Sequence, residues 1–493
     1  MSVIVERFQR IHRDAPERPL VHLPATSTTL TASDLANASV AHQQALERLG
    51  LGGDTLVMLA LGNRPAVFPF WLACLRAGIP VMPVDAGATS AEILALASRF
   101  GATVAVLPSN SPLGADVGQR ADFCDGLVAL TFAGIEPQPD ICRGAAALKI
   151  TSGSTGLPKA TFTTETELVL DTEHIVEAMG IRPEHTQIAA VPLSHAYGLG
   201  NVLMPVLMQG TAVILREGFV PHALPGDARA YGADVFKGVP FMFEHFAAAP
   251  PPGGWPPTLR ILVSAGARLE AATVRRFFEV CGVKIHSFYG TSETGGIAFD
   301  ESPGITDETT VGHLLRDVRV TLRPEPGAPD DGGRVHVAGP TVAARYAGAA
   351  DADGSFVDGG YLTGDFARFD DNGRIVLTGR VSRFVNVAGR KVQPDEVEAV
   401  LRGMPGIRDA RVLGAPDASR GQQIVACLVA DGPRPDMLAI RQYCASRLAV
   451  YKLPRLVIWL DHIPVTPRGK TDRAQLERLV AGKLGEGHKM GML

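Results

Sequence analysis

Short apolar runs alternate with helical patterns through the first three quarters of the chain. The runs are rich in branched residues and end at turn-forming residues, and they predict strands at Leu148–Ile150, Thr211–Leu215, Leu259–Val263 and Val283–Phe288. Helical patterns fall between them, for example at Ser90–Phe100 and Ala271–Val280. This alternation predicts an α/β fold, with a large N-terminal domain of layered mixed or parallel sheets and helices.

The pattern becomes more compact after about Arg380. We predict helices at Asp395–Met404 and Met437–Leu448, and strands at Arg411–Leu413, Gln423–Val429 and Leu456–Leu460. A segment of about 110 residues is long enough to form an independent α+β domain. We therefore place a boundary between a large domain, 1–381, and a small mobile domain, 382–493. The last twelve residues, 482–493, lack apolar periodicity and are expected to be frayed.

Composition and charge exclude several classes of protein. Apolar residues make up 46% and charged residues 20% of the 493 residues, which is typical of a globular protein. The net charge of −4, without a long basic stretch, argues against a nucleic-acid partner. The most apolar region, Leu56–Val84, is interrupted by Asn63, Arg64 and Arg76, so no membrane span is expected. Six widely spaced cysteines without a Cys-x-x-Cys pair indicate reduced thiols and a cytoplasmic location.

A loop dense in glycine and hydroxyl residues follows the first predicted strand and ends at Lys159. Glycines let backbone N–H groups approach phosphate oxygens, the hydroxyls add donors, and Lys159 adds a positive charge. A proline precedes the lysine and an alanine follows it, so this is not a Walker A loop. An ordinary Ser/Gly/Thr turn is disfavoured because twelve consecutive residues fit a polyphosphate site. The expected phosphate contacts besides Lys159 are Thr151, Ser152, Gly153, Ser154, Thr155 and Gly156.

The loop resembles the phosphate-binding motif of the acyl-adenylate-forming (AMP-binding) superfamily. That superfamily includes acyl- and aryl-CoA synthetases, the adenylation domains of peptide synthetases and firefly-type luciferases. Four further motifs follow in the order expected for the family, and the resemblance covers nearly the whole chain. It implies an acyl- or aryl-CoA synthetase, or an acyl-carrier-protein ligase, which forms an acyl-AMP from ATP and an acid.

The segment Ser287–Gly295 resembles the adenine and magnesium motif of the family. The resemblance implies that Tyr289, Gly290, Thr291 and Ser292 contact the nucleotide. It also implies that Glu293, together with Thr155, binds Mg²⁺, because Mg²⁺ prefers carboxylate and other oxygen ligands. The family usually has threonine where Ser292 stands, and the hydroxyl is kept. Taken alone, Glu293 would be read as a solvated loop carboxylate.

The remaining motifs extend toward the C-terminus. Asp365, in a Thr-Gly-Asp segment, resembles the carboxylate that accepts both ribose hydroxyls, and Arg380 resembles an arginine that contacts the ribose or phosphates. Ser382 stands at the swivel, where the family often has aspartate or lysine. Gly389 and Lys391 lie in a loop that is thought to line the pantetheine tunnel. Lys470 resembles the adenylation lysine, although a lysine in a Gly-Lys turn is a solvated surface charge in most proteins.

The acid pocket is expected around His195 and Tyr197. Amino-acid-activating relatives tend to have aspartate where Ala196 stands, so the resemblance disfavours a free α-amino acid and favours an uncharged fatty or aromatic tail. His195 and Tyr197 could equally be satisfied core residues. Further pocket candidates are Gly266, Gly290 and Ile297.

The implied reaction joins two negatively charged groups. Mg²⁺ on Glu293, with Lys159 and Lys470, would stabilise the transition state, and His195 would act at the acid. The implied cofactors are ATP, Mg²⁺ and coenzyme A or phosphopantetheine. The implied partners are a small carboxylic acid and either coenzyme A or a discrete acyl carrier protein. Two other classes remain open: a non-catalytic nucleotide-binding module and a luciferase-like oxygenase.

Overall fold

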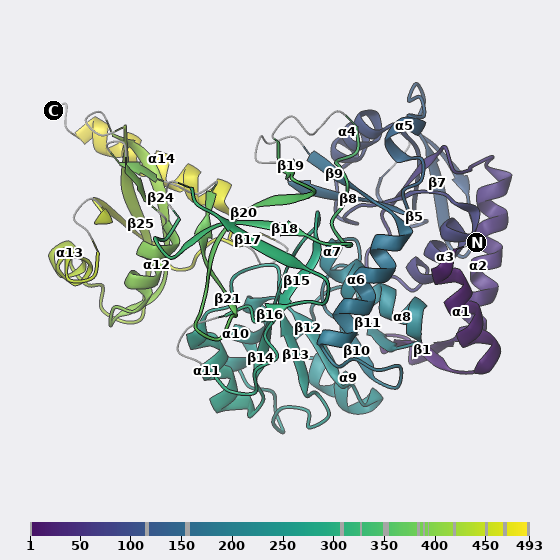
Figure 1. Cartoon of the computed structure of the whole chain (residues 1–493), viewed down its shortest axis with the longest axis horizontal. Coiled ribbons are helices and arrows are strands. Elements are labelled where there is room, and N and C mark those ends of the chain that lie inside the picture. Colours follow the sequence, from purple (N-terminus) through teal and green to yellow (C-terminus); the bar gives the residue numbers. More distant parts are fainter. Residues whose placement is uncertain are drawn as a thin grey trace. The chain divides into compact units, whose positions relative to one another are not determined.

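The computed structural model describes residues 2–113, 118–152, 158–305, 310–325, 328–348, 354–381, 385–387, 390–392, 394–417, 421–448, 452–466 and 471–490. The chain forms two compact units (Figure 1). Unit 1 comprises Met1–Val320 and Val337–Tyr361, and unit 2 comprises Thr321–His336 and Leu362–Leu493. No helix in the described ranges has both the length and the apolar character required to cross a membrane.

Unit 1 contains a nine-stranded mixed sheet in the order β16-β15-β14-β13-β12-β10-β11-β1-β2. The central strands are parallel to one another and comprise β14, β13, β12, β10, β11 and β1. The edge strands pair antiparallel: β2 at one edge, and β15 and β16 at the other. Their bounds are β1 Pro19–Leu23, β2 Thr28–Thr31, β10 Thr186–Ala189, β11 Ala212–Leu215, β12 Val235–Gly238, β13 Ile261–Ser264, β14 Ile285–Thr291, β15 Gly295–Phe299 and β16 His313–Leu314.

A second sheet of unit 1 has seven strands in the order β6-β7-β5-β3-β4-β8-β9. Their bounds are β3 Leu56–Leu59, β4 Val81–Pro83, β5 Ala102–Pro108, β6 Gln119–Asp122, β7 Leu127–Thr131, β8 Ala147–Ser152 and β9 Pro158–Thr163. The helices of unit 1 are α1 Val3–Asp14, α2 Ala32–Arg48, α3 Val67–Ala77, α4 Ser90–Phe100, α5 Pro139–Cys142, α6 Glu165–Ala178, α7 Ala196–Gly198, α8 Met204–Gln209, α9 Leu224–Tyr231, α10 Pro240–Ala248 and α11 Ala271–Cys281. A π-helix, η1 Leu199–Leu203, joins α7 to α8.

Helices cover both faces of the nine-stranded sheet (Figure 1). Side chains alternate between the faces of a strand, so Phe236 and Lys237 of β12 point in opposite directions. The Phe236 ring lies 5.1 Å from that of Phe243 on α10, whereas Lys237 contacts η1. Apolar side chains therefore pack on both faces of this sheet. A separate apolar cluster packs against the seven-stranded sheet. Helix α6 starts at a capping box formed by Thr164 and Glu167, which fixes where the helix begins.

A third sheet has five strands, in the order β17-β18-β20-β19, with β21 paired to β20. Its strands are β17 Arg319–Arg323, β18 Gly332–Ala338, β19 Phe356–Val357, β20 Gly360–Phe369 and β21 Ile375–Arg380. The division between the units falls within β17, β18 and β20.

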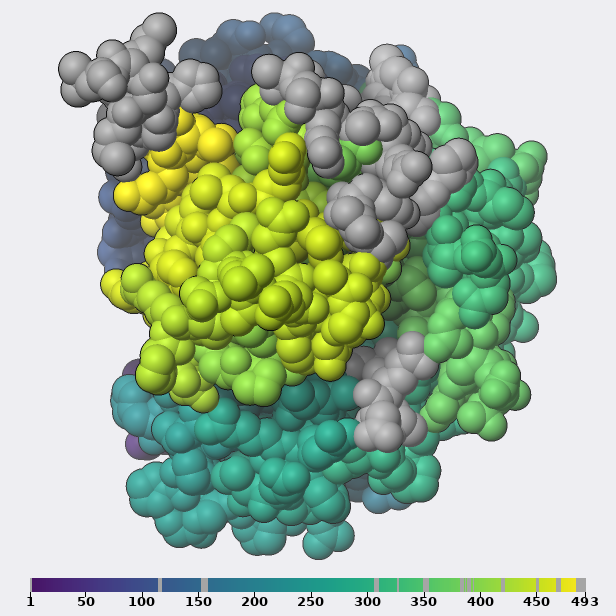
Figure 2. Space-filling view, turned by 90° about the vertical axis from the view of Figure 1, so that its left-hand side faces the viewer, coloured from purple at the N-terminus to yellow at the C-terminus, as the bar shows by residue number. Residues whose placement is uncertain are grey.

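The C-terminal part of unit 2 is an α+β fold. Its sheet has the order β23-β22-β25-β24, with β26 paired to β25, and its C-terminal residues form one compact mass, lime to yellow in Figure 2. The elements are β22 Val385–Val387, β23 Arg390–Val392, β24 Ile407–Asp417, β25 Gly421–Ala430, β26 Leu456–Trp459, α12 Pro394–Arg402, α13 Met437–Ala445 and α14 Arg473–Met490. Buried residues on the two faces of β25 form two separate apolar clusters.

The predicted fold class is confirmed: the chain has layered mixed sheets with helices in a large N-terminal part and a smaller α+β part after it. The expected fraying of residues 482–493 is wrong as far as Met490, where α14 ends. Leu476 and Val480 anchor this helix in an apolar cluster, and once a helix is nucleated each further residue adds a hydrogen bond. The predicted domain boundary after residue 381 marks the point about which the small domain would rotate, and it stays a prediction.

Candidate active site

The β8–β9 hairpin brings the two ends of the expected phosphate loop together. Thr151 pairs with Lys159 and Ser152 pairs with Pro158 across the antiparallel ladder. Lys159 is only 7% exposed. The tip of the loop lies outside the described residues and comprises Gly153, Ser154, Thr155, Gly156 and Leu157.

Lys159 and Glu293 both contact one tyrosine, Tyr346. The Lys159 Nζ lies 4.7 Å from the centre of the Tyr346 ring. The Tyr346 hydroxyl donates a hydrogen bond to Glu293 Oε1 at 3.0 Å and lies 2.9 Å from the Tyr361 hydroxyl. Since the Tyr346 proton goes to the carboxylate, Tyr361 is the donor in the second bond. The structure thus brings a cation and a carboxylate, which is 7% exposed, to one aromatic side chain.

The Tyr346 hydroxyl is held in its protonated form. Burial, followed by the neighbouring Glu293 carboxylate, raises the pKa of Tyr346 well above its usual range. The hydroxyl therefore stays a donor at neutral pH. Tyr346 was not singled out from the sequence, because it belongs to no motif with recognisable spacing. Tyr361 stands two residues before the Thr-Gly-Asp segment and was assigned no role from the sequence.

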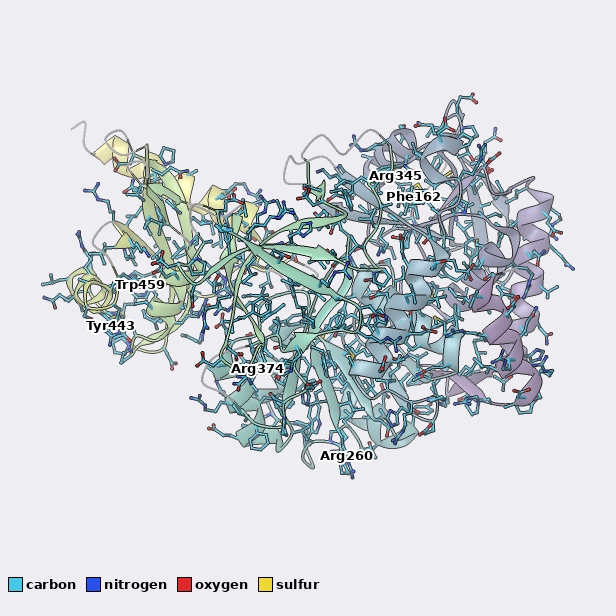
Figure 3. The ribbon with its side chains drawn as sticks, in the orientation of Figure 1. Phe162, Arg260, Arg345, Arg374, Tyr443 and Trp459 are labelled. Atoms are coloured by element: carbon cyan, nitrogen blue, oxygen red, sulfur yellow. The ribbon has the colours of Figure 1, made fainter. Side chains whose placement is uncertain are left out.

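Pairing with β9 fixes the position of Tyr346. The Phe162 N–H donates to the Arg345 carbonyl at 3.0 Å, and the Ala347 N–H donates to the Ala160 carbonyl at 2.8 Å. The Arg345 guanidinium lies 4.2 Å from the centre of the Phe162 ring, and the two side chains lie together in Figure 3. Tyr346 is thus held on both sides along its backbone, beside the strand that carries Lys159.

Hydrogen bonds also fix the loop that carries Glu293. The N–H groups of Glu293 and Thr294 both donate to Thr291 Oγ1 at 3.2 Å. The Ala343 N–H donates to the Glu293 carbonyl at 2.8 Å, and the Thr341 hydroxyl donates to the Thr294 carbonyl at 2.8 Å. Ser292, next to Glu293, accepts a hydrogen bond from Thr161 of β9 through its carbonyl. These bonds fix the backbone of the loop from which the Glu293 side chain projects.

Close backbone approach explains the glycines around this loop. A Cβ on Gly290 would lie 2.6 Å from the Gly295 carbonyl, and Gly295 itself has φ of +69°. Asp171 of α6 accepts a hydrogen bond from the Gly296 N–H at 2.8 Å. Tyr289, which precedes Gly290 on β14, is buried. The β14–β15 turn is thus closely packed, both within its own backbone and against α6.

A second lysine, Lys149, is buried near this turn. Burial lowers the pKa of Lys149, while the charges of Asp171, Glu293 and Glu167 act in the opposite direction. Burial raises the pKa of Asp171, and Lys149 opposes that rise. Lys149 was assigned no role from the sequence, although it lies in the strand that leads into the phosphate loop, and Asp171 of α6 was not singled out.

The acid-pocket candidates lie around the start of α7. His195 precedes this helix, and its Nε2 lies 3.9 Å from the Asp85 carboxylate. This nitrogen has no hydrogen-bond partner in the part of the chain that the structure describes. The Tyr197 hydroxyl donates to the Val263 carbonyl at 3.2 Å, and its ring is stacked on Phe288 with 6.1 Å between centres. Burial raises the pKa of Tyr197, so this hydroxyl stays protonated.

The structure also describes two other residues predicted for the acid pocket. Gly266, which follows β13, has φ of +79°, a conformation that favours glycine. Ile297 of β15 is fully buried in the core.

In unit 2, Asp365 and Arg380 are neighbours. They face each other across the β20–β21 ladder, and Arg380 Nε lies 2.7 Å from Asp365 Oδ1. Arg380 is 46% exposed, so its guanidinium remains accessible to a ligand. The Asp365 N–H donates to Thr363 Oγ1 at 3.1 Å. Lys391 has its backbone in β23, and Ser382, Gly389 and Lys470 lie outside the described residues.

Comparisons with known proteins cover most of the chain. Residues 8–347 match the AMP-binding enzyme family, and residues 396–470 match the AMP-binding enzyme C-terminal domain. Feruloyl-CoA synthase of an Amycolatopsis species is 29% identical over 474 residues, which cover 92% of this chain and 94% of that protein. The 2-succinylbenzoate–CoA ligase of Geobacillus kaustophilus is 26% identical over 463 residues, with 92% and 93% covered. ATP-bound MatB from Rhodopseudomonas palustris has a similar fold, with a TM-score of 0.83, 24% identity, and 97% and 99% covered.

Proposed function

Because this chain belongs to the AMP-binding enzyme family, we propose that it activates an aromatic or fatty carboxylic acid as its acyl-AMP and then forms a thioester with coenzyme A. At the coarser level it is an AMP-forming ligase. The CoA ligases of this family use ATP, Mg²⁺ and coenzyme A.

The observation that carries this proposal is the arrangement of Lys159 and Glu293 around Tyr346. Adenylation requires a carboxylate anion to approach a triphosphate, so the site must supply positive charge. Lys159 supplies one charge at the end of the phosphate loop. Glu293, oriented by Tyr346, provides oxygen ligands of the kind that Mg²⁺ prefers.

The chemistry of Glu293 fits a magnesium ion. A carboxylate has about four lone-pair positions, and the Tyr346 hydroxyl uses one of them. The remaining positions can coordinate a metal, and bound Mg²⁺ would neutralise the phosphates. Thr155 is proposed as a second contact to the ion from its position in the sequence.

We assign each predicted site residue to one part of the substrates in the first half-reaction, the adenylation of the acid. An oxygen of the acid attacks the α-phosphorus, a phosphorus–oxygen bond forms, and the bond to pyrophosphate breaks. We assign Lys159 to the β- and γ-phosphates, Lys470 to the acid and the α-phosphate, and Asp365 with Arg380 to the ribose. Tyr289, Gly290, Thr291 and Ser292 are assigned to the nucleotide. His195 is assigned to the acid.

The acid is proposed to be aromatic. The stacked rings of Tyr197 and Phe288 offer a flat apolar wall next to His195, and aromatic side chains bind flat rings well. Two relatives are named for aromatic acids, feruloyl and 2-succinylbenzoate. A fatty acid is the alternative class.

The acceptor of the second half-reaction is proposed to be coenzyme A. A discrete acyl carrier protein, through its phosphopantetheine thiol, is the alternative. We propose that the small domain, residues 382–493, rotates near Ser382 between the half-reactions, which would exchange Lys470 for the loop with Gly389 and Lys391. All six cysteines are free, which supports the cytoplasm as the location.

The test is a panel of aromatic and fatty acids incubated with ATP, Mg²⁺ and hydroxylamine, which traps acyl-adenylates as hydroxamates. We expect hydroxamate with at least one aromatic acid, and loss of it in Glu293→Gln. Repeating the assay with coenzyme A and with a carrier protein identifies the acceptor. Nucleotide binding without hydroxamate from any acid would instead indicate a non-catalytic module.

A further inference from the structure

A lysine without a counter-ion is buried beneath the expected acid pocket. Lys237, the third residue of β12, is 0% exposed. Its Nζ donates to Gln187 Oε1 at 3.2 Å and to the Asn201 carbonyl in η1. In the part of the chain that the structure describes, no carboxylate lies within ion-pair distance of it. An ammonium group has three donors, and two of them have acceptors among the described residues.

Lys237 lies on the sheet face that Tyr197 covers. It is in register with Val263, whose carbonyl accepts the Tyr197 hydroxyl. On the next strand Val263 is in register with His286, so Phe288, two residues further on, points to the same face. Phe288 stacks on Tyr197. Lys237 therefore neighbours the aromatic wall proposed for the acid.

Asn201 is a second buried polar residue beside Lys237. Its side-chain oxygen is buried and finds no hydrogen-bond donor among the described residues. The two ends of an asparagine amide exchange places on rotation, so this side chain can turn its NH₂ toward an anion. Asn201 lies four residues after Tyr197 and belongs to a π-helix, an irregularity that is frequent at functional sites.

We propose that the acid pocket ends in an anion site, where Lys237 and Asn201 bind a second anionic group at the end of the substrate opposite the activated carboxylate. The substrate class is then a dicarboxylic or similarly dianionic acid, in place of the uncharged tail expected from the sequence. This inference rests on the proposed function. Because Lys237 is fully buried, an anion can reach it only when the side chains that cover it move.

The surroundings of Lys237 give the site a pH dependence. Burial lowers the pKa of Lys237 to about 7. The described polar and titratable groups on the elements around it include Gln187 on β10, Asn201 on η1, Tyr197 on α7, His286 on β14, and Asp171 and His174 on α6. Helix α6 also carries Glu165, Glu167, Glu173 and Glu177. Burial lowers the pKa of His286 and of His174, so neither adds a charge at neutral pH. An anion binds the protonated amine, so KM for a dianionic acid should rise above about pH 7 and level off below it.

The experiment compares dicarboxylic acids with their monomethyl esters, which keep the shape and remove one charge. The panel comprises terephthalate and straight-chain dicarboxylates of four to eight carbons. In the wild type, kcat/KM for pyrophosphate exchange should favour a diacid over its ester by on the order of 100-fold, because a buried site built for a polar group rejects an analogue that lacks it. Lys237→Met should abolish this preference and the rise of KM with pH.

Lys284→Met is the matched control, because Lys284 is also buried at the same sheet but is paired with Asp300 at 2.8 Å. It should leave the preference unchanged. A wild-type enzyme that favours the esters, or a preference that persists in Lys237→Met, would overturn the anion site. If no acid is turned over, the proposed function fails. The anion site can then still be tested by measuring the affinity of the diacids for the wild type and for Lys237→Met by calorimetry. The anion site requires a lower affinity in the variant.

Discussion

Lys159 and Glu293 both contact the side chain of Tyr346, so its hydroxyl should matter for magnesium. Tyr346→Phe keeps the ring that faces Lys159 and removes the proton given to Glu293. Loss of a group that orients a metal ligand typically costs about 10- to 100-fold in metal affinity or activity. We expect the Mg²⁺ concentration for half-maximal pyrophosphate exchange to rise in that range, while KM for the acid stays unchanged.

Tyr361→Phe is the control for this change. It removes the outer hydroxyl, which touches Tyr346 but not the carboxylate, so its effect on the Mg²⁺ requirement should be smaller. A merely structural role for Tyr346 would lower stability without moving the Mg²⁺ requirement. Thermal unfolding of both variants, measured beside the Mg²⁺ titration, separates the two roles.

At the residue scale, side chains that belong to motifs could be predicted from the sequence. The side chains that position them could not. Lys159 and Glu293 could be predicted because each sits in a local run of characteristic residues. Tyr346 joins them only because residues 345–347 pair with β9, far away in the sequence. Lys237 likewise could not be predicted as an anion-binding residue, because its neighbours come from other elements: Asn201 from η1 and Tyr197 from α7. No local pattern encodes such long-range contacts.

The β14–β15 turn is the element most sensitive to a small substitution. Gly295→Ala places a Cβ 2.5 Å from the Asp171 carboxylate at a backbone φ of +69°, so it introduces both a clash and strain. We expect the free energy of unfolding to fall by about 2–4 kcal/mol, since core overpacking and strain of this kind add. Urea unfolding followed by tryptophan fluorescence measures this change.

Gly282→Ala separates strain from clash. Gly282 ends α11 with φ of +73°, and a Cβ there would meet nothing within 4 Å. It should therefore cost only about 1 kcal/mol, the usual penalty for a residue other than glycine in this conformation. Equal losses in the two variants would mean that Asp171 moves aside without resistance.

At the element scale, local signals fixed some boundaries and long-range pairing fixed others. Helix α4 was predicted with its observed bounds, because Thr89 and Glu92 form a capping box and Gly101 ends the helix. Strand β24 was predicted only at Arg411–Leu413, yet it extends over Ile407–Asp417 because β25 pairs with it throughout. Such pairing overrides the weak local propensity of residues such as Gly414 and Pro416.

The whole molecule consists of two units, each with residues assigned to the reaction. Unit 1 contains Lys159 and Glu293, whereas unit 2 contains the Asp365–Arg380 pair. The α/β class and the change of pattern near Arg380 followed from the sequence. The assignment of Thr321–His336 to unit 2 did not, because it depends on strands that pair across distant parts of the chain.

Division of the reaction between the two parts of the chain predicts that the half-reactions can be separated. Lys470 is assigned to adenylation alone, so Lys470→Ala should lower pyrophosphate exchange by on the order of 100- to 1,000-fold, the usual cost of losing one charge-stabilising group. Thiolysis of a supplied acyl-adenylate by coenzyme A should stay within about twofold of the wild type, because an interaction absent from that transition state cannot affect its rate. Lys483→Ala, in the exposed part of α14, is the control and should change neither half-reaction. Equal losses in both half-reactions would show that one arrangement of the units serves both steps, and exchange at the wild-type rate would remove Lys470 from the adenylation site.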